Sequence, residues 1–294
     1  MSPGRRSELR PLLVVDGDSL AHRAYHALPK SINQNAVVGF TNMLVRLWET
    51  EEPRTVFVGW DTLTAPTYRH EALAAYQSGR VFDDSLLEQL DKLPRVVEAL
   101  GFATAKADGY EADDFVAAAV RSEEERGGTA VVVTSDRDLF QLASDRTVIV
   151  TPVRGVSELA RVGPAEVRER YGVEPPQVPD FIALRGDPSD RIPGAPGVGA
   201  KTAASILKQH GSLQAALDAG RFPNLRKELE LYRRIATLDA SAPLPPLQDQ
   251  SPNWAEASSL LESWGLGNLA GRLAARSAIA PPRSTGPFGR RNGG

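Results

Sequence analysis

LLVVDGDSL, at residues 12–20, is the stretch that decides the fold class of this chain. Its apolar, Val-rich start is typical of a short buried strand, and Asp16 stands where that strand ends. Similar runs follow at residues 55–60, 130–134 and 147–151. Helical patterns lie between these runs, over residues 37–48, 86–100 and 113–126. Strands that alternate with helices predict an α/β fold with a mostly parallel central sheet flanked by helices.

Composition sets limits on the class of protein. The 294 residues are 41% hydrophobic and 24% charged, as in an ordinary globular chain. There is no cysteine, which excludes disulfides and thiolate zinc sites. The apolar run before Asp16 is too short for the core of a signal peptide, and no run is long enough to span a membrane. We therefore expect a cytoplasmic protein.

The formal net charge of −3 is unevenly distributed along the chain. Residues 1–179 hold 20 Lys and Arg against 27 Asp and Glu, whereas residues 180–294 hold 14 against 10. Two bound divalent cations would cancel much of the acidic excess in the first part. The weakly basic second part is a modest electrostatic signal for a phosphate-rich partner.

Eight carboxylates in four short clusters are the strongest chemical signal. They lie in LLVVDGDSL, GYEADD, VVVTSDRDL and RGDPSDRIPG, and are Asp16, Glu111, Asp113, Asp114, Asp136, Asp138, Asp187 and Asp190. Most of them adjoin the ends of expected strands, where ligand sites lie in open α/β sheets. Like charges gathered in one crevice repel one another, and hard divalent cations relieve that repulsion. The clusters therefore predict a two-metal enzyme acting on phosphodiesters or phosphoryl groups.

Each cluster taken alone has a simpler interpretation. Acidic residues favour helix N-termini, where they cap free N–H groups and meet the helix dipole, and Asp16 could be an ordinary turn residue. Asp18, two residues beyond Asp16, could be a second ligand. The recurrence of four clusters beside element ends favours the metal site over four separate caps.

IPGAPGVGAKTAASIL, at residues 192–207, predicts phosphate contact. Gly197 and Gly199 open a helix expected at 200–210, and Lys201 and Thr202 stand in its first turn. Free N–H groups at a helix start bind phosphate, although a tightly packed helix–turn–helix corner would use the same glycines. The spacing is not that of a Walker A loop.

The remaining segments suggest the chain's organisation. Residues 64–82, with little apolar periodicity, could be a mobile insertion beside the site or a plain surface connection. Further helices are expected at 213–219 and 226–238, then a proline-rich linker at 239–253, a last helical piece at 254–276 and a disordered tail at 277–294.

The ordered set DGDSLAHRA, GFTNML, YRHEAL, GYEADD, TSDRDLFQLASD and GDPSDRIPGAPGVGAKTA resembles the bacterial 5′ nuclease family. This family is the flap-endonuclease-like 5′-3′ exonuclease domain joined to some bacterial DNA polymerases, also found as stand-alone proteins. The resemblance covers roughly residues 11–275 and implies a PIN-like nuclease core at 11–175. It also implies a helical arch inserted at about 64–95 and a helix–hairpin–helix DNA-binding domain at 176–276. No polymerase domain follows here, so we expect a stand-alone member.

The resemblance also implies roles for particular residues. The eight carboxylates would hold two or more Mg²⁺ or Mn²⁺ ions, and the helix–hairpin–helix would grip duplex phosphates and often a monovalent cation such as K⁺. For the reaction itself we expect Arg69 and Arg80 to stabilise charge on the scissile phosphate, and Tyr68 and Tyr76 to stack on an unpaired base.

Two departures from the family pattern stand out. Gln77 occupies the position after Tyr76 where the family commonly has Lys, so a hydrogen-bond donor replaces a cation that would contact the reacting phosphate. Asp18 stands where the family tends to have Asn, which adds a negative charge near the metals.

These features together predict a metal-dependent 5′ nuclease that cleaves DNA at 5′ flaps or 5′ ends in replication and repair. We expect a monomer associated with the nucleoid. Two alternatives remain. The D-x-D pattern of Asp16 and Asp18 also fits a haloacid-dehalogenase-like phosphatase, in which Asp16 would be the nucleophile and Asp18 the acid. A non-catalytic protein that binds branched DNA, with Gln77 marking lost catalysis, is the other.

Overall fold

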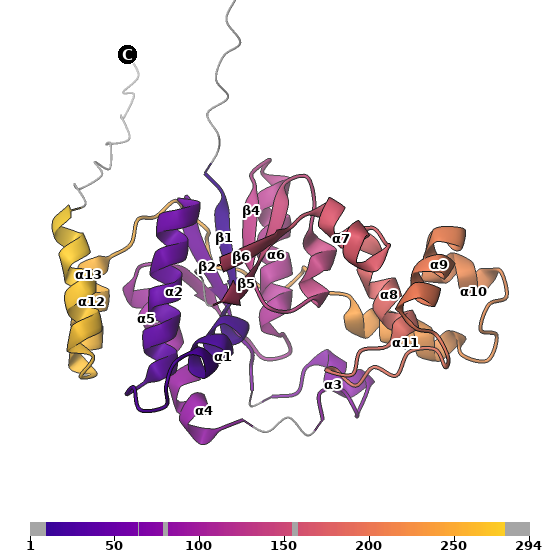
Figure 1. The fold of residues 1–294 in the computed structure, drawn as a ribbon, viewed down its shortest axis with the longest axis horizontal. Helices are drawn as coiled ribbons and strands as arrows, with labels where there is room; N and C mark the ends of the chain where they lie inside the picture. The colour runs from indigo at the N-terminus through magenta and orange to yellow at the C-terminus, as the bar shows by residue number, and fades with distance from the viewer. Residues whose placement is uncertain (1–9, 64, 79–81, 155–157, 280–294) are drawn as a thin grey trace, which may run out of the picture.

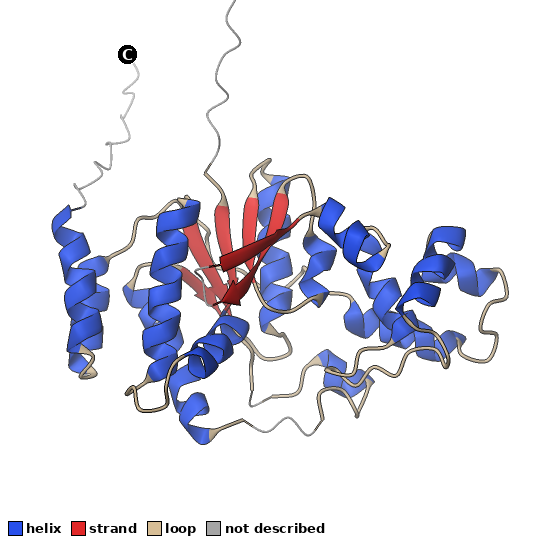
Figure 2. Cartoon of the chain, in the orientation of Figure 1, coloured by secondary structure: helices blue, strands red, loops and turns tan. Residues whose placement is uncertain are grey.

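A six-stranded sheet forms the centre of the molecule (Figure 2). The computed structural model describes residues 10–63, 65–78, 82–154 and 158–279. The strands run in the order β3-β2-β1-β4-β5-β6. All neighbours pair in parallel except β5 and β6, which are antiparallel at one edge. The strand bounds are β1 Leu12–Asp16, β2 Thr55–Gly59, β3 Ala103–Ala105, β4 Ala130–Val133, β5 Thr147–Arg154 and β6 Glu158–Val162. The predicted, mostly parallel α/β fold is confirmed.

The sequence analysis missed β3 and β6. The three residues of β3 are half-buried, and four of the five residues of β6 are exposed or half-buried. Neither strand has the continuous apolar run that marks a strand buried on both faces. Both lie at the edges of the sheet, where one side of the strand has no hydrogen-bonding neighbour.

Alternate residues of the strands serve two separate layers. Leu12 and Val14 pack on one face with α6, and Leu13 and Val15 pack on the other face with the first helices of the chain. The layer on the second face is made of α1 Gly17–Ala27, α2 Asn35–Glu51, α4 Asp84–Leu90 and α5 Leu93–Ala99. On the first face, α6 Ala112–Glu125 belongs to the same apolar cluster as the helices that follow β6 (Figure 1).

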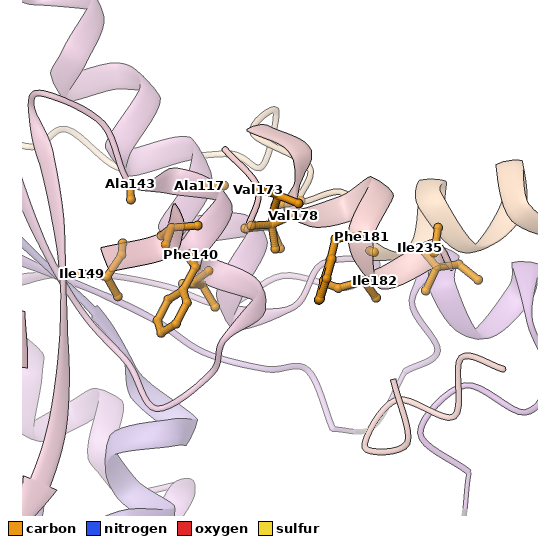
Figure 3. Close-up of a cluster of buried hydrophobic side chains, with 14 of the residues drawn as sticks. Ala117, Phe140, Ala143, Ile149, Val173, Val178, Phe181, Ile182 and Ile235 are labelled. Carbon is orange, nitrogen blue, oxygen red and sulfur yellow. The ribbon is translucent and has the colours of Figure 1, made fainter. Parts of the chain in front are cut away.

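One continuous apolar cluster joins the sheet to that helical part (Figure 3). It runs from Ile149 and Phe140 through Val178 and Phe181 to Ile235. The elements along this line are η1 Asp138–Leu142, α7 Pro164–Tyr171, η2 Pro175–Gln177, α8 Val178–Arg185, α9 Ala200–His210, α10 Leu213–Asp218 and α11 Arg226–Ala236. The shared core holds the helical part against the α/β core.

The helix predicted over residues 86–100 is two helices, α4 and α5. Pro94 lies in the first turn of α5. Backbone N–H groups in the first turn have no hydrogen-bond partner within the helix, so the missing N–H of proline costs nothing there. In the middle of one long helix the same proline would remove a backbone hydrogen bond. α3 Tyr68–Ala72 and α4 are the described helices of the predicted arch insertion.

The predicted helical piece at 254–276 is a hairpin of α12 Trp254–Ser263 and α13 Gly267–Ile279, joined by a turn at Gly265. We placed it in the DNA-binding domain at 176–276, but its apolar side packs on the layer that contains α5 (Figure 1). The linker at 239–253, which lacks helix and strand, carries the chain to this position. Residues 280–294 of the predicted tail lie outside the described residues, and residues 277–279 belong to α13.

A buried ion pair ties this linker to the core. Arg54 Nε and Nη2 donate to the two carboxylate oxygens of Glu123, at 3.1 and 2.5 Å. Arg54 Nη1 donates to the Leu247 carbonyl at 2.7 Å and to Asp249 at 2.9 Å. Because Glu123 lies near the C-terminal end of α6, this pair fixes that end of the helix.

None of the described helices has the length and apolar character needed to cross a membrane.

Leu261→Ala tests the packing of the hairpin. Leu261 is fully buried, so truncation leaves a cavity and is expected to lower the free energy of unfolding by about 2–5 kcal/mol. Urea unfolding measures the loss. Leu260→Ala, one residue away on a less buried face, is the control and is expected to lose less. Equal losses would contradict the packing described here.

Candidate active site

Seven carboxylates line one cavity of about 560 Å³ at the carboxyl edge of the sheet. All but Asp190 lie at or just after a strand end or at the start of a helix, which is why residues far apart in the sequence meet here. The seven are Asp16, Asp18, Asp61, Glu111, Asp113, Asp136 and Asp190. All were predicted as ligands or possible ligands except Asp61.

Asp16 is held firmly by its neighbours. As the N-cap of α1 it accepts a hydrogen bond from the Ser19 N–H at 3.0 Å, and the Thr134 hydroxyl donates to its other oxygen at 2.8 Å. Asp16 is therefore both a helix cap and a member of the cavity wall. The two interpretations weighed for this residue are compatible.

Asp61 is the carboxylate that the sequence analysis missed. It follows β2, and its Oδ1 accepts from the Ala112 N–H at 2.7 Å, at the start of α6. Its own N–H donates to Asp18 Oδ2 at 2.7 Å. The signal that identified Asp16, an acid just after a buried strand, is also present in TVFVGWD and could have found it.

A second cavity of about 730 Å³ adjoins the first and shares Ser135 and Asp136 with it. Asp138 and Asp187 line this second cavity. The turn that carries Asp187 is closed by paired backbone hydrogen bonds to Ile192, both 2.8 Å long. Asp136 therefore stands between two groups of acids, one in each cavity.

The turn at Asp187 depends on a glycine. Gly194 has a φ of +73°, and a Cβ there would lie 2.4 Å from the Gly186 nitrogen. No other residue fits that backbone without moving the turn. The Gly/Pro-bounded turn expected from the sequence is thus a close backbone approach that places Asp187 and Asp190.

Asp114 and Arg69 have different positions from those expected. Arg69 is 1% exposed, and its Nη1 and Nη2 donate to the two oxygens of Asp114 at 2.8 and 2.7 Å. Asp114 is fully buried and also accepts from the backbone N–H groups of Glu111 and Asp239. With four donors on two oxygens, this carboxylate has no free position for a cation. Buried Arg69, likewise, cannot contact a phosphate in the cavity.

The two tyrosines predicted to stack on an unpaired base also differ. Tyr76 lines the carboxylate cavity and its hydroxyl donates to Glu111 at 3.0 Å, but the residue is 3% exposed, which leaves little ring surface for stacking. Tyr68 donates to the Thr237 carbonyl at 3.0 Å, lies against Arg69 and lines a separate cavity. Neither ring is free to stack in the carboxylate cavity.

Gln77 lines the carboxylate cavity as expected for a residue near the reacting group. Its amide nitrogen donates to the Tyr76 hydroxyl at 2.9 Å and to Asp190 Oδ1 at 3.2 Å. Gln77 therefore links the base of the insertion to the turn at Asp190. Arg80, the other predicted cationic residue, lies outside the described residues.

The predicted phosphate-binding residues lie at the exposed start of α9. Gly199 is the N-cap of this helix. A Cβ built at Gly197 or Gly199 would have no other atom within 4 Å, so the space beside both glycines is open. Lys201 and Thr202 in the first turn are exposed. The first N–H groups of the helix are accordingly open to a ligand from outside the chain.

Burial and mutual repulsion shift the acids of the wall. Burial, with smaller contributions from the nearby charges of Asp61 and Asp136, raises the pKa of Asp16 to about 7, although the hydrogen bonds from Ser19 and Thr134 lower it. Burial also raises the pKa of Asp18, Asp113 and Asp138 well above the usual range, and neighbouring carboxylates add to each shift. The wall therefore favours either protons or an external cation.

The donor set fits a hard divalent cation. Within the described ranges, no three His, Asp or Glu side chains are already arranged around one ion position; the acids line the cavity walls instead. One buried oxygen, Asp113 Oδ1, has no hydrogen-bond donor among the described residues, and Arg69 Nη2 is 3.8 Å from it. An orphaned, buried carboxylate oxygen beside other carboxylates is chemically suited to a cation such as Mg²⁺.

Comparison with known families agrees with this site. The model for the N-terminal resolvase-like domain of 5′-3′ exonucleases matches residues 11–172, and the model for their C-terminal SAM fold matches residues 173–255. The chain belongs to the 5′-3′ exonuclease family. The recognition made from the sequence motifs is confirmed.

Among curated relatives, DNA polymerase I of Mycobacterium tuberculosis is 42% identical over 215 residues, which covers 70% of this chain and 24% of the polymerase. DNA polymerase I of Bacillus subtilis is 34% identical over 294 residues, covering 93% and 33%. This chain spans about a quarter to a third of the length of these relatives. A bacteriophage T5 flap endonuclease, solved as a complex with DNA and metal ions, shares the fold with a TM-score of 0.64 at 20% identity, covering 92% of this chain and all of that one.

The pKa of Asp16 makes a testable prediction about stability without metal. Its folded value, about 7, lies above its ordinary value of 3.8, so the folded state binds the proton more tightly. This contribution to stability is complete below pH 3.8 and is lost as the pH rises through 7. In chelator, raising the pH from about 5 to about 8 should lower the free energy of unfolding of the wild type but not of Asp16→Asn. The variant should therefore gain about 2–3 kcal/mol of stability relative to wild type over this range.

Urea unfolding at the two pH values measures the difference between the two proteins. Asp145→Asn, at an exposed position near the start of β5, supplies the baseline for a substitution outside the wall. A stability difference between Asp16→Asn and wild type that does not change with pH would show that Asp16 is already ionised when buried. Saturating Mg²⁺ should remove the pH dependence.

Proposed function

We propose that this protein is a metal-dependent, structure-specific 5′ nuclease that hydrolyses DNA phosphodiesters at 5′ flaps or 5′ ends in replication and repair. The observation that carries the proposal is the wall of acids across two adjoining cavities, with Asp136 between them. Family membership supports the reaction class, because both family models are those of 5′-3′ exonucleases.

Two Mg²⁺ or Mn²⁺ ions would be held by the acids of the two cavities. Asp16, Asp113 and Asp136 are suited to one ion, and Asp136, Asp138 and Asp187 to the other. Bound cations of this kind activate water and stabilise a leaving oxygen. Glu111 is held by the Thr67 and Tyr76 hydroxyls at 2.7 and 3.0 Å, so it completes the wall in a fixed orientation.

The α9 start would contact the duplex part of the substrate. Its open N–H groups, Lys201 and Thr202 provide phosphate contacts that read backbone geometry and not base sequence. A monovalent cation such as K⁺ at Gly197 and Gly199 would add positive charge there. The excess of basic residues after residue 179 supports contact with DNA on this side of the molecule.

Gln77 would face the substrate strand from the insertion. Gln77 can orient the scissile phosphate by a hydrogen bond but carries no charge, so charge stabilisation would fall to Arg80 and the cations. Arg69 is excluded from that role by its burial. A monomer is sufficient for this arrangement, since every proposed contact comes from one chain, and a DNA substrate would place it at the nucleoid.

An end-labelled 5′-flap duplex and a matching blunt duplex test the function. With Mg²⁺ or Mn²⁺, wild type should cut near the flap junction, and chelator should abolish cutting. Asp136→Ala should lower the rate by about 100-fold or more, because the acid shared by both cavities is lost. Asp145→Ala, an exposed acid at the opposite edge of the sheet, is the matched control and should cut normally.

Other outcomes would point elsewhere. Tight flap binding without cleavage in either metal would favour the non-catalytic branched-DNA-binding protein. Neither binding nor cleavage would rule out both DNA-directed functions and leave the phosphatase to be assayed.

Asp18→Asn separates the nuclease from the phosphatase. Asp18 accepts a hydrogen bond from the Asp61 N–H at 2.7 Å, and the Asn carbonyl oxygen can accept the same bond. As a nuclease, the variant should keep flap cleavage within about threefold of wild type, since an amide retains the hydrogen bond. In a phosphatase Asp18 would be the proton donor, and the same substitution would abolish turnover of p-nitrophenyl phosphate.

A further inference from the structure

We propose that Arg69 is a positioning residue that sets the cation affinity of the carboxylate wall by tying the base of the insertion, α6 and the segment after α11 to one buried carboxylate, Asp114. The inference rests on the proposed function only in taking Glu111 and Asp113 as part of a cation site. Arg69 does not line either carboxylate cavity, so it acts through its neighbours.

One guanidinium faces all three acids of the GYEADD cluster. Arg69 makes the two short hydrogen bonds to Asp114, and its Nη1 and Nη2 lie 3.5 Å from Glu111 Oε2 and 3.8 Å from Asp113 Oδ1. Arg69 thus neutralises the inner side of the cluster and leaves the outer side for an ion.

The same pair joins three parts of the chain. Arg69 belongs to α3 and Asp114 to the first turn of α6. Arg69 Nε donates to the Ile235 carbonyl of α11 at 3.0 Å, and the Asp239 N–H donates to Asp114 at 2.8 Å. Loss of the guanidinium would release the insertion, α6 and the α11 segment together.

The connection to the cation site is direct. Asp114 Oδ2 accepts from the backbone N–H of Glu111, so the pair fixes the residue that opens α6. Asp113 stands between these two residues, and its Oδ1 is the orphaned buried oxygen. Partners that orient a ligand from behind typically change metal affinity by roughly 10- to 100-fold when removed.

The chain contains a matched control for this pair. Arg54 also donates two hydrogen bonds to a buried carboxylate, Glu123, and a third to a backbone carbonyl. Glu123 lies on the same helix, nine residues after Asp114, which is about 13 Å along the axis. Arg54 lines neither carboxylate cavity. The two pairs therefore share their chemistry and differ in their distance from the wall.

The experiment compares Arg69→Lys with Arg54→Lys. Lysine keeps the charge but cannot form the paired hydrogen bonds of a guanidinium, so both variants should lose thermal stability. Mn²⁺ titration followed by electron paramagnetic resonance should show cation affinity lowered roughly 10- to 100-fold in Arg69→Lys, as for lost orienting partners, and unchanged in Arg54→Lys. Flap binding in chelator should be retained by both.

Each outcome decides the proposal. Unchanged Mn²⁺ affinity in Arg69→Lys would overturn it, and so would an equal loss in Arg54→Lys, which would make the effect one of general stability. Suppose that wild type binds Mn²⁺ but cuts no flap, and that Arg69→Lys binds Mn²⁺ more weakly. The nuclease function then fails, while this inference stands. If Arg69→Lys does not fold, Asp114→Asn replaces it, because it keeps the side-chain shape.

A measurement on wild type needs no variant. Saturating Mg²⁺ should slow amide hydrogen exchange in residues 68–73 and 235–239, because the pair links both segments to the cation site. Neither segment contains a proposed cation ligand or a residue that lines either carboxylate cavity, so slowing there reports the linkage itself. Slowing confined to the cavity-lining acids and their neighbours would overturn the proposal.

Discussion

Concentrated negative charge at one edge of the sheet is the constraint on which the rest of this structure depends. Burial raises the pKa of Asp16 and Asp138, so the ionised form of each is unfavourable without a nearby positive charge. Within the chain, the charge of Arg69 reaches the inner side of this edge, where it is saturated by Asp114. The outer side faces two cavities, and there a bound cation would complete the balance.

The fold meets this constraint with few elements. Parallel strands bring their carboxyl ends to the same edge, so short acidic segments after β1, β2 and β4 converge without long loops. The start of α6 supplies Glu111, Asp113 and Asp114, and the turn after α8 supplies Asp187 and Asp190. The two ends of α6 are fixed by buried arginines, Arg69 at the start and Arg54 near the end. A rigid α6 keeps the acids of its first turn in one orientation.

The segments proposed to contact DNA share contacts with the same wall. Thr67, Tyr76 and Gln77, at the base of the insertion, all donate to its acids. The turn that carries Asp187 and Asp190 leads directly into the exposed start of α9. DNA bound by the insertion or by α9 would therefore act on the residues that surround the cations, which couples substrate binding to assembly of the site.

The sequence by itself determined the four inner strands of the sheet, most of the acids and the family, because buried apolar runs, strand-end acids and Gly-rich turns are local signals. Only the tertiary structure separated Asp113, which faces the cavity, from Asp114, which is sealed by Arg69. Adjacent residues of the same type give no local sign of which one is buried. The same reason applies to Arg69, whose partners come from α6 and α11. It also applies to the hairpin at 254–279, whose apolar face packs on helices that are distant in the sequence.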